Sequence, residues 1–377
     1  MDSASSAEWQ KFIYFWGMLK DKKTILALSI FPQYIIIKWL SHYPEFIEQY
    51  YSNGFYQFIS KLFRYTLGWI PFSFGDFVYA FAIVYGLRWL YKNRKRLRKD
   101  TKQWFVDVFS AVAIIYFAFH LFWGMNYYRL PLHKNLNLEA DYTTEQLIAV
   151  TKKLIEKSNA LYVEIKKNDT TKVDLPYSKS DILKLAPKGY NNLKELFPDL
   201  EYHPKNIKKS LFSYPLTYMG FSGYLNPLTN EAQVDGLIPV YKFPTTASHE
   251  IAHQVGYAAE NEANFIGCLA AIKHDDVYFK YSGYTFALRF CLNEINRRDE
   301  VLFNTLVETV NKGILENYRE AREFWEAHQN PLEPFFKGFY SNFLKANNQV
   351  KGMESYSYVV ALLVNYFEKE TDLIYDE

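Results

Sequence analysis

Apolar residues gather in three long runs in the first third of the chain, and polar residues separate these runs. The run at 104–125, WFVDVFSAVAIIYFAFHLFWGM, matches the length of about 20 residues that a helix needs to cross a bilayer. The run at 72–91 has a shorter strictly apolar part, and the run at 24–40 contains Pro32. The pattern predicts three membrane helices in a membrane domain at 1–125. Buried helices of a soluble domain are the alternative, which the length of the third run disfavours most.

Charge in the connecting loops predicts the orientation of these helices. The loop KNRKRLRKDTK at 92–102 carries seven Lys and Arg against one Asp, and short loops this basic stay in the cytoplasm. The third helix would then run outward, which places residues 126–377 outside the cytoplasm. The loop at 41–71 would lie outside as well. Its segment FYQFISKLFRYTLGWI has the amphipathic pattern of a helix that lies on the membrane surface.

Beyond the membrane domain, the pattern becomes that of a mostly helical domain with a few strands. Thr143 followed by Gln146 forms a capping-box pattern ahead of helical spacing, and a second helical stretch breaks at Pro187. Residues 211–243 interleave short aromatic and branched runs with Gly, Pro and Asn, which predicts two or three short strands. Helices resume at Thr246. The expected fold is therefore mainly α, with an α+β outer domain.

Composition narrows the range of partners. The formal net charge of +2 gives no reason to expect nucleic acid or another polyanion. Aromatic residues make up 19% of the chain, and Trp and Tyr favour membrane interfaces, which agrees with a lipid bilayer as partner. Cys268 and Cys291 do not form a disulfide framework. Each is expected to be a small buried apolar residue, with a single disulfide left open.

The stretch TTASHEIAHQVGYAAENEANF at 245–265 carries the candidate chemistry. His249 and His253 lie one helical turn apart, share a face and are spaced to hold one Zn²⁺. Glu250 is offset by one position, where a general base can take a proton from metal-bound water. Gly256 is expected to end the helix in a left-handed conformation. A surface helix with unrelated histidines is the alternative, and it leaves the closing glycine and the nearby glutamates unexplained.

Catalytic zinc needs a third protein ligand and an open position, and two glutamates compete for the role. In a helix over 259–273, Glu260 lies on the face of the small residues Ala263, Asn264, Gly267 and Ala271. Glu262 shares a face with larger apolar residues. Because a ligand needs close helix packing, the pattern favours Glu260 and keeps Glu262 as the alternative. Asn264 is placed to hydrogen-bond a ligand histidine.

Two further features bear on substrate binding. An exposed edge strand beside a zinc helix can pair with an extended peptide, and either GFSGYLNP at 220–227 or AQVDGLIPVY at 232–241 is a candidate for this edge. Tyr281 and Tyr284 lie on the next expected helix. Either hydroxyl is a candidate for stabilising the oxyanion that forms during hydrolysis.

The sequence resembles the bacterial membrane proteins grouped as domain of unknown function 3810. The resemblance is carried by the three apolar runs and by PTTASHEIAHQVGY, ENEANF, YSGYTFAL (281–288), NFLKAN (342–347) and SYSYVVALL (355–363). More broadly, the site is similar to HExxH zinc metallopeptidases whose third ligand opens a Glu-x-x-Ala-Asn pattern, which ENEAN matches with Glu260 first. Only six residues separate His253 from Glu260, a shorter spacing than in most such enzymes.

The resemblance implies a zincin-like outer domain on a multi-pass protein of the bacterial inner (cytoplasmic) membrane, with the domain on the periplasmic side. The resulting hypothesis is a membrane-anchored zinc metallopeptidase. His249, His253 and Glu260 would hold Zn²⁺, and Glu250 would be the general base for hydrolysis of a peptide or protein substrate. A non-catalytic zinc-binding sensor of the cell envelope and a zinc amidase acting on the cell wall are the alternatives.

Overall fold

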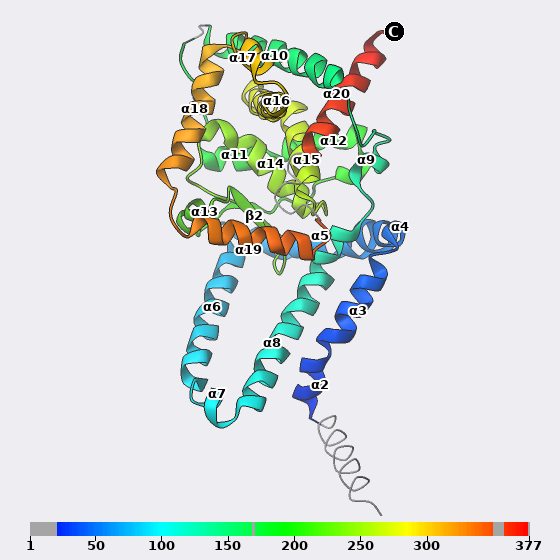
Figure 1. Cartoon of the computed structure of the whole chain (residues 1–377), viewed down its shortest axis with the longest axis vertical. Coiled ribbons are helices and arrows are strands. Elements are labelled where there is room, and N and C mark those ends of the chain that lie inside the picture. The colour runs from blue at the N-terminus through cyan, green and yellow to red at the C-terminus, as the bar shows by residue number, and fades with distance from the viewer. Residues whose placement is uncertain (1–20, 168–169, 350–357, 376–377) are drawn as a thin grey trace, which may run out of the picture.

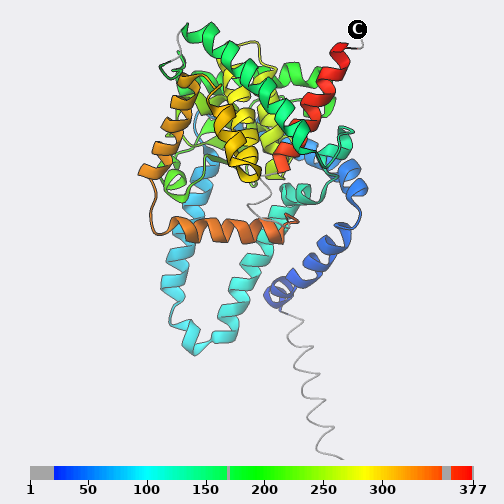
Figure 2. The ribbon, with the colours of Figure 1, turned by 45° about the horizontal axis from the view of Figure 1, so that its top comes forward.

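Helices dominate the chain, and they form a lower group of long rods and an upper group of packed helices (Figure 1). The computed structural model describes residues 21–167, 170–349 and 358–375, so the first three residues of SYSYVVALL lie outside the described part. In the turned view, the rods still project from one side of the packed helices (Figure 2). The mainly α class expected from the sequence is confirmed.

The lower group and the helices at its upper end come from the N-terminal third. They are α2 (Lys22–Leu28), α3 (Ile30–Leu40), α4 (Pro44–Phe46), the π-helix η1 (Ile47–Phe55), α5 (Tyr56–Leu67), α6 (Phe74–Asn93), α7 (Arg96–Lys99) and α8 (Thr101–Phe122). The turn that contains α7 lies at the end of the rods farthest from the packed helices (Figure 1).

Two of the three predicted membrane spans are long and apolar enough to cross a bilayer. Among the described residues, these are Lys22–Leu40, formed by α2 and α3 together, and Thr101–Phe122. The second predicted span, α6, is not among these two helices; it has 20 residues but includes three tyrosines and a tryptophan, as well as charged residues near both ends. These residues suit membrane interfaces and lower the hydropathy of the helix. α2 and α3 meet at Ser29, three residues before Pro32, whose ring removes a helical hydrogen bond.

The upper group takes in the rest of the chain. Its helices are η2 (Gly124–Tyr128), α9 (Leu132–Asn135), α10 (Thr144–Lys166), α11 (Lys179–Leu185), α12 (Pro187–Leu196), η3 (Pro198–Leu200), α13 (Ser213–Met219), η4 (Val240–Lys242), α14 (Phe243–Gln254), α15 (Glu260–Ile272), α16 (Val277–Arg298), α17 (Glu300–Val307), α18 (Lys312–Ala327), α19 (Glu333–Ala346) and α20 (Val359–Tyr375). Its strands are β1 (Ile207–Lys209), β2 (Gly223–Asn226) and β3 (Glu231–Val234).

Several local signals read from the sequence are confirmed. α10 begins with the expected capping box, in which the Thr143 hydroxyl accepts from the Gln146 amide and the Gln146 side chain accepts from the Thr143 amide. The helical stretch breaks before Pro187, which then opens α12. Cys268 and Cys291 are both free and buried, so they pack as small apolar residues.

The strands form one small sheet with β3 in its centre. β1 pairs parallel to β3, and β2 pairs antiparallel to it with Leu225 opposite Ala232. GFSGYLNP therefore supplies β2, which is an edge strand. AQVDGLIPVY contains most of the central strand, so the expectation that it might form the edge is wrong. Because β3 is paired on both sides, it has no free edge along which another strand could form hydrogen bonds.

Candidate metal centre

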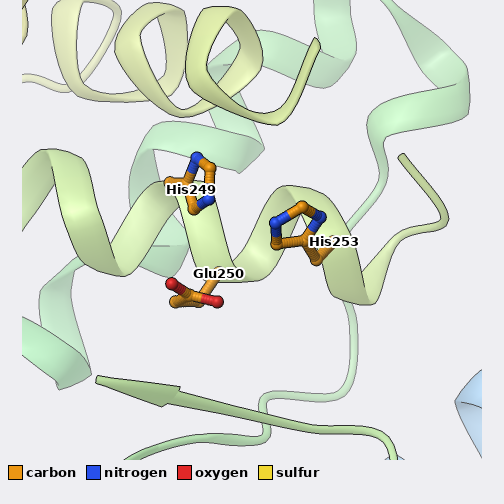
Figure 3. Close-up of side chains that lie close together, drawn as sticks. All are labelled: His249, Glu250 and His253. Carbon is orange, nitrogen blue, oxygen red and sulfur yellow. The ribbon is translucent and has the colours of Figure 1, made fainter. Parts of the chain in front are cut away.

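α14 presents the HExxH residues on adjacent sides of one helix (Figure 3). Pro244 lies in its first turn, where the missing amide hydrogen has no helical partner to lose. The rings of His249 and His253 have centroids 4.6 Å apart and planes at 84°. Gly256 follows the helix with φ +108°, a backbone conformation that favours glycine.

α15 brings a carboxylate to the two imidazoles. Glu260 Oε2 lies 3.5 Å from His249 Nε2, and Glu260 Oε1 lies 3.7 Å from His253 Nε2. The close approach depends on Gly267, because a Cβ there would lie 2.6 Å from the backbone nitrogen of His249. Glu260 is therefore the glutamate that the small-residue face of α15 carries to the histidines.

Each imidazole lies close to one oxygen of the Glu260 carboxylate. Ligand atoms about 2.0–2.2 Å from Zn²⁺ at tetrahedral angles lie roughly 3.4 Å from one another, and the separations of 3.5 Å at His249 and 3.7 Å at His253, which involve different oxygens of Glu260, are similar. The ligand atoms of His249, Glu250 and His253 also lie within 4.8 Å of one another. Of the two candidate glutamates, Glu260 is the one whose carboxylate lies beside both Nε2 atoms.

His253 is oriented as metal-binding histidines usually are. Its Nδ1 lies 2.7 Å from the carbonyl oxygen of Tyr257. Because a carbonyl only accepts hydrogen bonds, Nδ1 carries the hydrogen, and Nε2 is the atom left for a metal. Nδ1 of His249 is buried and has no hydrogen-bond partner among the described residues.

Contacts within the cluster shift its pKa values in opposite directions. Burial lowers the pKa of His249. Burial also disfavours the charged form of His253, but the hydrogen bond and charge of Glu260 outweigh it and raise the pKa to about 9. Burial acts to raise the pKa of Glu260, and the two imidazoles outweigh it and lower the pKa well below its usual range. The cluster thus pairs a buried anion with a buried imidazolium, and a cation would take the place of the proton.

Glu250 lies between the cluster and the edge strand. Its side chain is buried, and Oε2 has no hydrogen-bond partner among the described residues. Burial raises the pKa of Glu250 to about 8, and the charge of Glu260 acts in the same direction. A Cβ on Gly223 of β2 would lie 2.5 Å from Glu250 Oε1, so the strand backbone passes directly beside this carboxylate. An unpartnered carboxylate in this position is free to exchange protons with a ligand beside β2.

The C-terminal end of α14 is capped by three side chains from the N-terminal third and by Arg129. The carbonyl of His253 accepts from Trp123 Nε1 at 3.2 Å, and the carbonyl of Gln254 accepts from the Tyr56 hydroxyl at 2.9 Å. The next two carbonyls accept from Gln57 Nε2 at 3.1 Å and from Arg129 Nη1 at 2.9 Å. Carbonyls at a helix end lack helical partners, so these four bonds fix the end of the helix that carries His253.

The structure separates the remaining predicted residues into two groups. Glu262 Oε1 accepts from the backbone amide of Leu132 at 2.7 Å, which holds its carboxylate away from the imidazoles. Asn264 lines the same cavity as His249, and its side chain acts to raise the pKa of His249, so a hydrogen bond from Asn264 to a ligand histidine stays a prediction.

The proposed oxyanion role of the two tyrosines on α16 is corrected. Tyr281 is fully buried and donates its hydroxyl to Asn317 Oδ1 at 2.8 Å, and Tyr284 is half-buried against the core of the upper group. Neither lines the cavity at the histidines. The tyrosine that reaches the site is Tyr340 of α19, which donates its hydroxyl to Glu260 Oε1. No spacing in the sequence signalled it, because 80 residues separate the two.

The candidate site opens into a cavity of about 920 Å³. The cavity is lined by α14 and β2, by α19, and by residues from the upper ends of α6 and α8. Lys242 and Arg289 line it as well, and neither has a carboxylate partner among the described residues. Burial, together with the charge of Arg289, lowers the pKa of Lys242 to about 7. This part of the cavity is therefore suited to an anionic group.

Fold and site together define a mainly helical protein with two candidate membrane helices and a buried two-histidine, two-glutamate cluster. The chain belongs to the family described as "Protein of unknown function (DUF3810)", which it matches over residues 51–364. The match covers most of the chain, from η1 through α14 and α15 into α20. Neither the curated proteins nor the solved structures contain a match to it.

Proposed function

We propose that this protein is a membrane-anchored zinc metallopeptidase that hydrolyses peptide bonds outside the cytoplasm. The observation that carries the proposal is the convergence of three groups, with the Glu260 carboxylate 3.5 Å from His249 Nε2 and 3.7 Å from His253 Nε2. A buried Glu250 without a committed partner lies beside them. A purely structural site does not require such a base, which favours catalysis over a sensor role.

The roles of the residues follow from their positions. Zn²⁺, when bound, supplies Lewis-acid activation of water and of the scissile carbonyl. Glu250 takes the proton from the attacking water and later delivers it to the leaving amine as the C–N bond breaks. Tyr340 holds the Glu260 carboxylate through its hydroxyl, and Tyr257 holds the ring of His253.

β2 supplies a place for the substrate backbone. Within the described residues it pairs only with β3, so its other edge has free amide and carbonyl groups. An extended peptide that adds to this edge gains main-chain hydrogen bonds. Because the backbone at Gly223 passes beside Glu250, such a peptide lies next to the base. The edge strand thus supports a peptide over a substrate without an extended backbone.

Three crossings remain our proposal for the membrane part, with α6 as the second span. α6 and α8 have 20 and 22 residues, or about 30 and 33 Å of helix, which matches the hydrocarbon thickness. The basic turn at α7 joins them at the end farthest from the metal centre (Figure 1). At the same end, Asp107 is paired with Lys23 at 2.8 Å and with Arg96 at 3.0 Å. Basic turns stay in the cytoplasm, which leaves the metal centre on the periplasmic side of a bacterial inner membrane.

Metal content and hydrolysis in the purified full chain test the proposal. We expect one zinc per chain in the wild type and in His42→Ala, a matched control at an exposed histidine. His249→Ala should lose the metal. Glu250→Gln should keep the metal and lose hydrolysis of a mixed peptide library. Equal hydrolysis by the wild type and Glu250→Gln would refute the mechanism.

The alternatives give different results in the same experiment. X-ray absorption that reports four protein ligands would indicate a closed, structural site and a sensor role. Zinc with an open position, combined with cleavage of cell-wall fragments and not of peptides, would indicate an amidase. A wild type without zinc after supplementation would remove the metal from the proposal altogether.

A further inference from the structure

α5 exposes apolar side chains and buries polar ones. Tyr56, Ser60 and Arg64, spaced four residues apart, are the buried positions of this helix. Phe58 is 66% exposed and Tyr65 is 62% exposed. A surface helix of a soluble domain has the opposite arrangement. A helix whose polar face packs on protein and whose apolar face points outward is suited to the membrane interface.

α19 shows the same exposed apolar character and lies across the ends of the rods. Phe335 and Phe339 are 68% and 69% exposed. In Figure 1, α19 runs across the upper ends of α6 and α8. The ring of Phe343 lies 5.8 Å from that of Phe119 on α8, which fixes α19 against the top of this rod. α19 therefore lies at the depth where the apolar rods begin.

The cavity at the metal centre extends to these rods. Tyr79 of α6 and Phe119 of α8 line the same cavity as His249 and Glu250. The ring of Tyr79 stacks on that of Tyr224 in β2, with centroids 6.1 Å apart. The edge strand thus lies directly on the upper end of α6, and a chain that follows this strand reaches the ends of the membrane helices.

The upper end of α6 is fixed to the sheet, so this geometry is built into the fold. Glu231 of β3 accepts from the backbone amides of Phe74 and Gly75 at the start of α6 and pairs with Lys208 at 2.5 Å. Asp76 accepts from the backbone amide of Leu211 at 2.7 Å. These carboxylates are fully buried, and they hold the start of the helix against the strands.

We propose that the substrate is a polypeptide anchored in the same bilayer, whose segment next to its membrane anchor enters the cavity from the side of α6 and α8. This inference rests on the proposed function and names its substrate class. The apolar faces of α5 and α19 place the cavity mouth at the membrane surface, where an anchored chain meets it. Anchoring in the same membrane raises the local concentration of the substrate, as a short flexible linker does.

Cleavage of matched reporters tests the substrate class. The first reporter is a span of about 20 Leu and Ala residues followed directly by a mixed peptide sequence. The second is the same sequence without the span, and the third has a spacer of about 40 residues, which reaches up to roughly 130 Å when extended. Zinc-loaded full chain in vesicles should cut the first at least about tenfold faster than the second. Most cuts should fall within about 10 residues of the span, a reach of roughly 33 Å. In the third reporter, the spacer moves the mixed sequence away from the span, so cutting within the mixed sequence should decrease.

The reporter results separate this proposal from the proposed function. Equal rates on anchored and free sequences would overturn the membrane-anchored substrate class and leave the peptidase proposal standing. Cleavage by Glu250→Gln would refute the peptidase mechanism. No cleavage of any reporter by a zinc-loaded chain would overturn both, and the placement of the cavity mouth would then be decided by a second measurement.

The second measurement does not depend on activity. A fluorophore attached to Phe339→Cys on α19 should be quenched by brominated lipids, because this position lies at the membrane surface. The same label at Val301→Cys on α17, which is 77% exposed, is the control and should not be quenched. The native cysteines are buried and do not compete for the label. Equal quenching at both positions, or none at Phe339→Cys, would refute the position of the cavity at the bilayer.

Discussion

Replacement of Gly267 by Ala is the sharpest perturbation of the candidate metal centre that changes none of the proposed ligand residues. The added Cβ would lie 2.6 Å from the backbone nitrogen and 2.7 Å from the Cα of His249. Ordinary contact begins at 3.4 Å, so α14 and α15 must move apart by about 3.4 − 2.6 = 0.8 Å. Zinc sites tolerate deviations of about 0.2 Å in ligand distance. Glu260 on α15 would therefore no longer reach the metal together with the histidines of α14.

The expected magnitudes separate stability from binding. Alanine is favoured over glycine in a helix by about 1 kcal/mol, and overpacking a core costs about 1–3 kcal/mol, so the free energy of unfolding should fall by about 0–2 kcal/mol. Changes in groups that merely support a ligand lower metal affinity about 10–100-fold. Displacement of a whole ligand helix should reach the upper end of this range, about 100-fold, or roughly 3 kcal/mol.

Zinc competition titration on the full chain measures the effect, with thermal unfolding of the same samples. Gly338→Ala is the matched control, because a Cβ there meets nothing within 4 Å on α19. The control should bind zinc as the wild type does and unfold at an equal or higher temperature. If Gly267→Ala binds zinc with wild-type affinity and its unfolding temperature is no lower than that of the control, then the close approach of the two helices does not position the ligands.

Three further substitutions test other parts of the structure. Tyr340→Phe removes the hydroxyl that supports the ligand carboxylate and should lower zinc affinity about tenfold, whereas Tyr214→Phe, at an exposed tyrosine, should not change it in the same titration. Glu231→Gln leaves the buried Lys208 without its carboxylate and should lower the free energy of unfolding by about 3–5 kcal/mol. Addition of Lys208→Met should recover part of this loss. An unfolding temperature unchanged from the wild type in Glu231→Gln would argue against the pair. Lys242 has its pKa lowered to about 7, so its ammonium loses its proton as the pH rises from 6 to 8. KM for peptides with an acidic residue should therefore rise over this range relative to neutral peptides, and a Lys242→Gln variant that keeps the full pH dependence would contradict this assignment.

The part of the site that lies on one helix was predictable from the sequence. His249 and His253 share a face because four residues make about one turn, and the small residues of α15 marked the face that packs closely on α14. The choice of Glu260 over Glu262 followed from this face, and the structure places Glu260 beside the imidazoles. Helical periodicity determines which residues share a face. It therefore predicts a site correctly where two helices that are neighbours in sequence pack through one face each.

Periodicity does not say which distant helix covers a site. Tyr281 and Tyr284 were chosen because their helix comes next in the chain, but α16 turns Tyr281 into the core toward Asn317. Tyr340 reaches Glu260 from a helix near the end of the chain. The same limit applies to the sheet, where the pattern located the strands and did not determine which of them would lie in the centre. Pairing order is set by contacts between segments, and a single sequence does not contain them.

The sequence pattern predicts a boundary between two independent domains near residue 125, and the structure shows that the two parts are joined by hydrogen bonds. The change from apolar runs to helical amphipathic spacing suggests two independent parts. However, Tyr56, Gln57 and Trp123 from the first part donate to consecutive carbonyls at the end of α14. If these donors and carbonyls were buried without forming the hydrogen bonds, several polar groups would be unsatisfied, each at a cost of about 1–3 kcal/mol. The helix that carries His253 is therefore completed by the N-terminal third, and the candidate metal centre belongs to the whole chain.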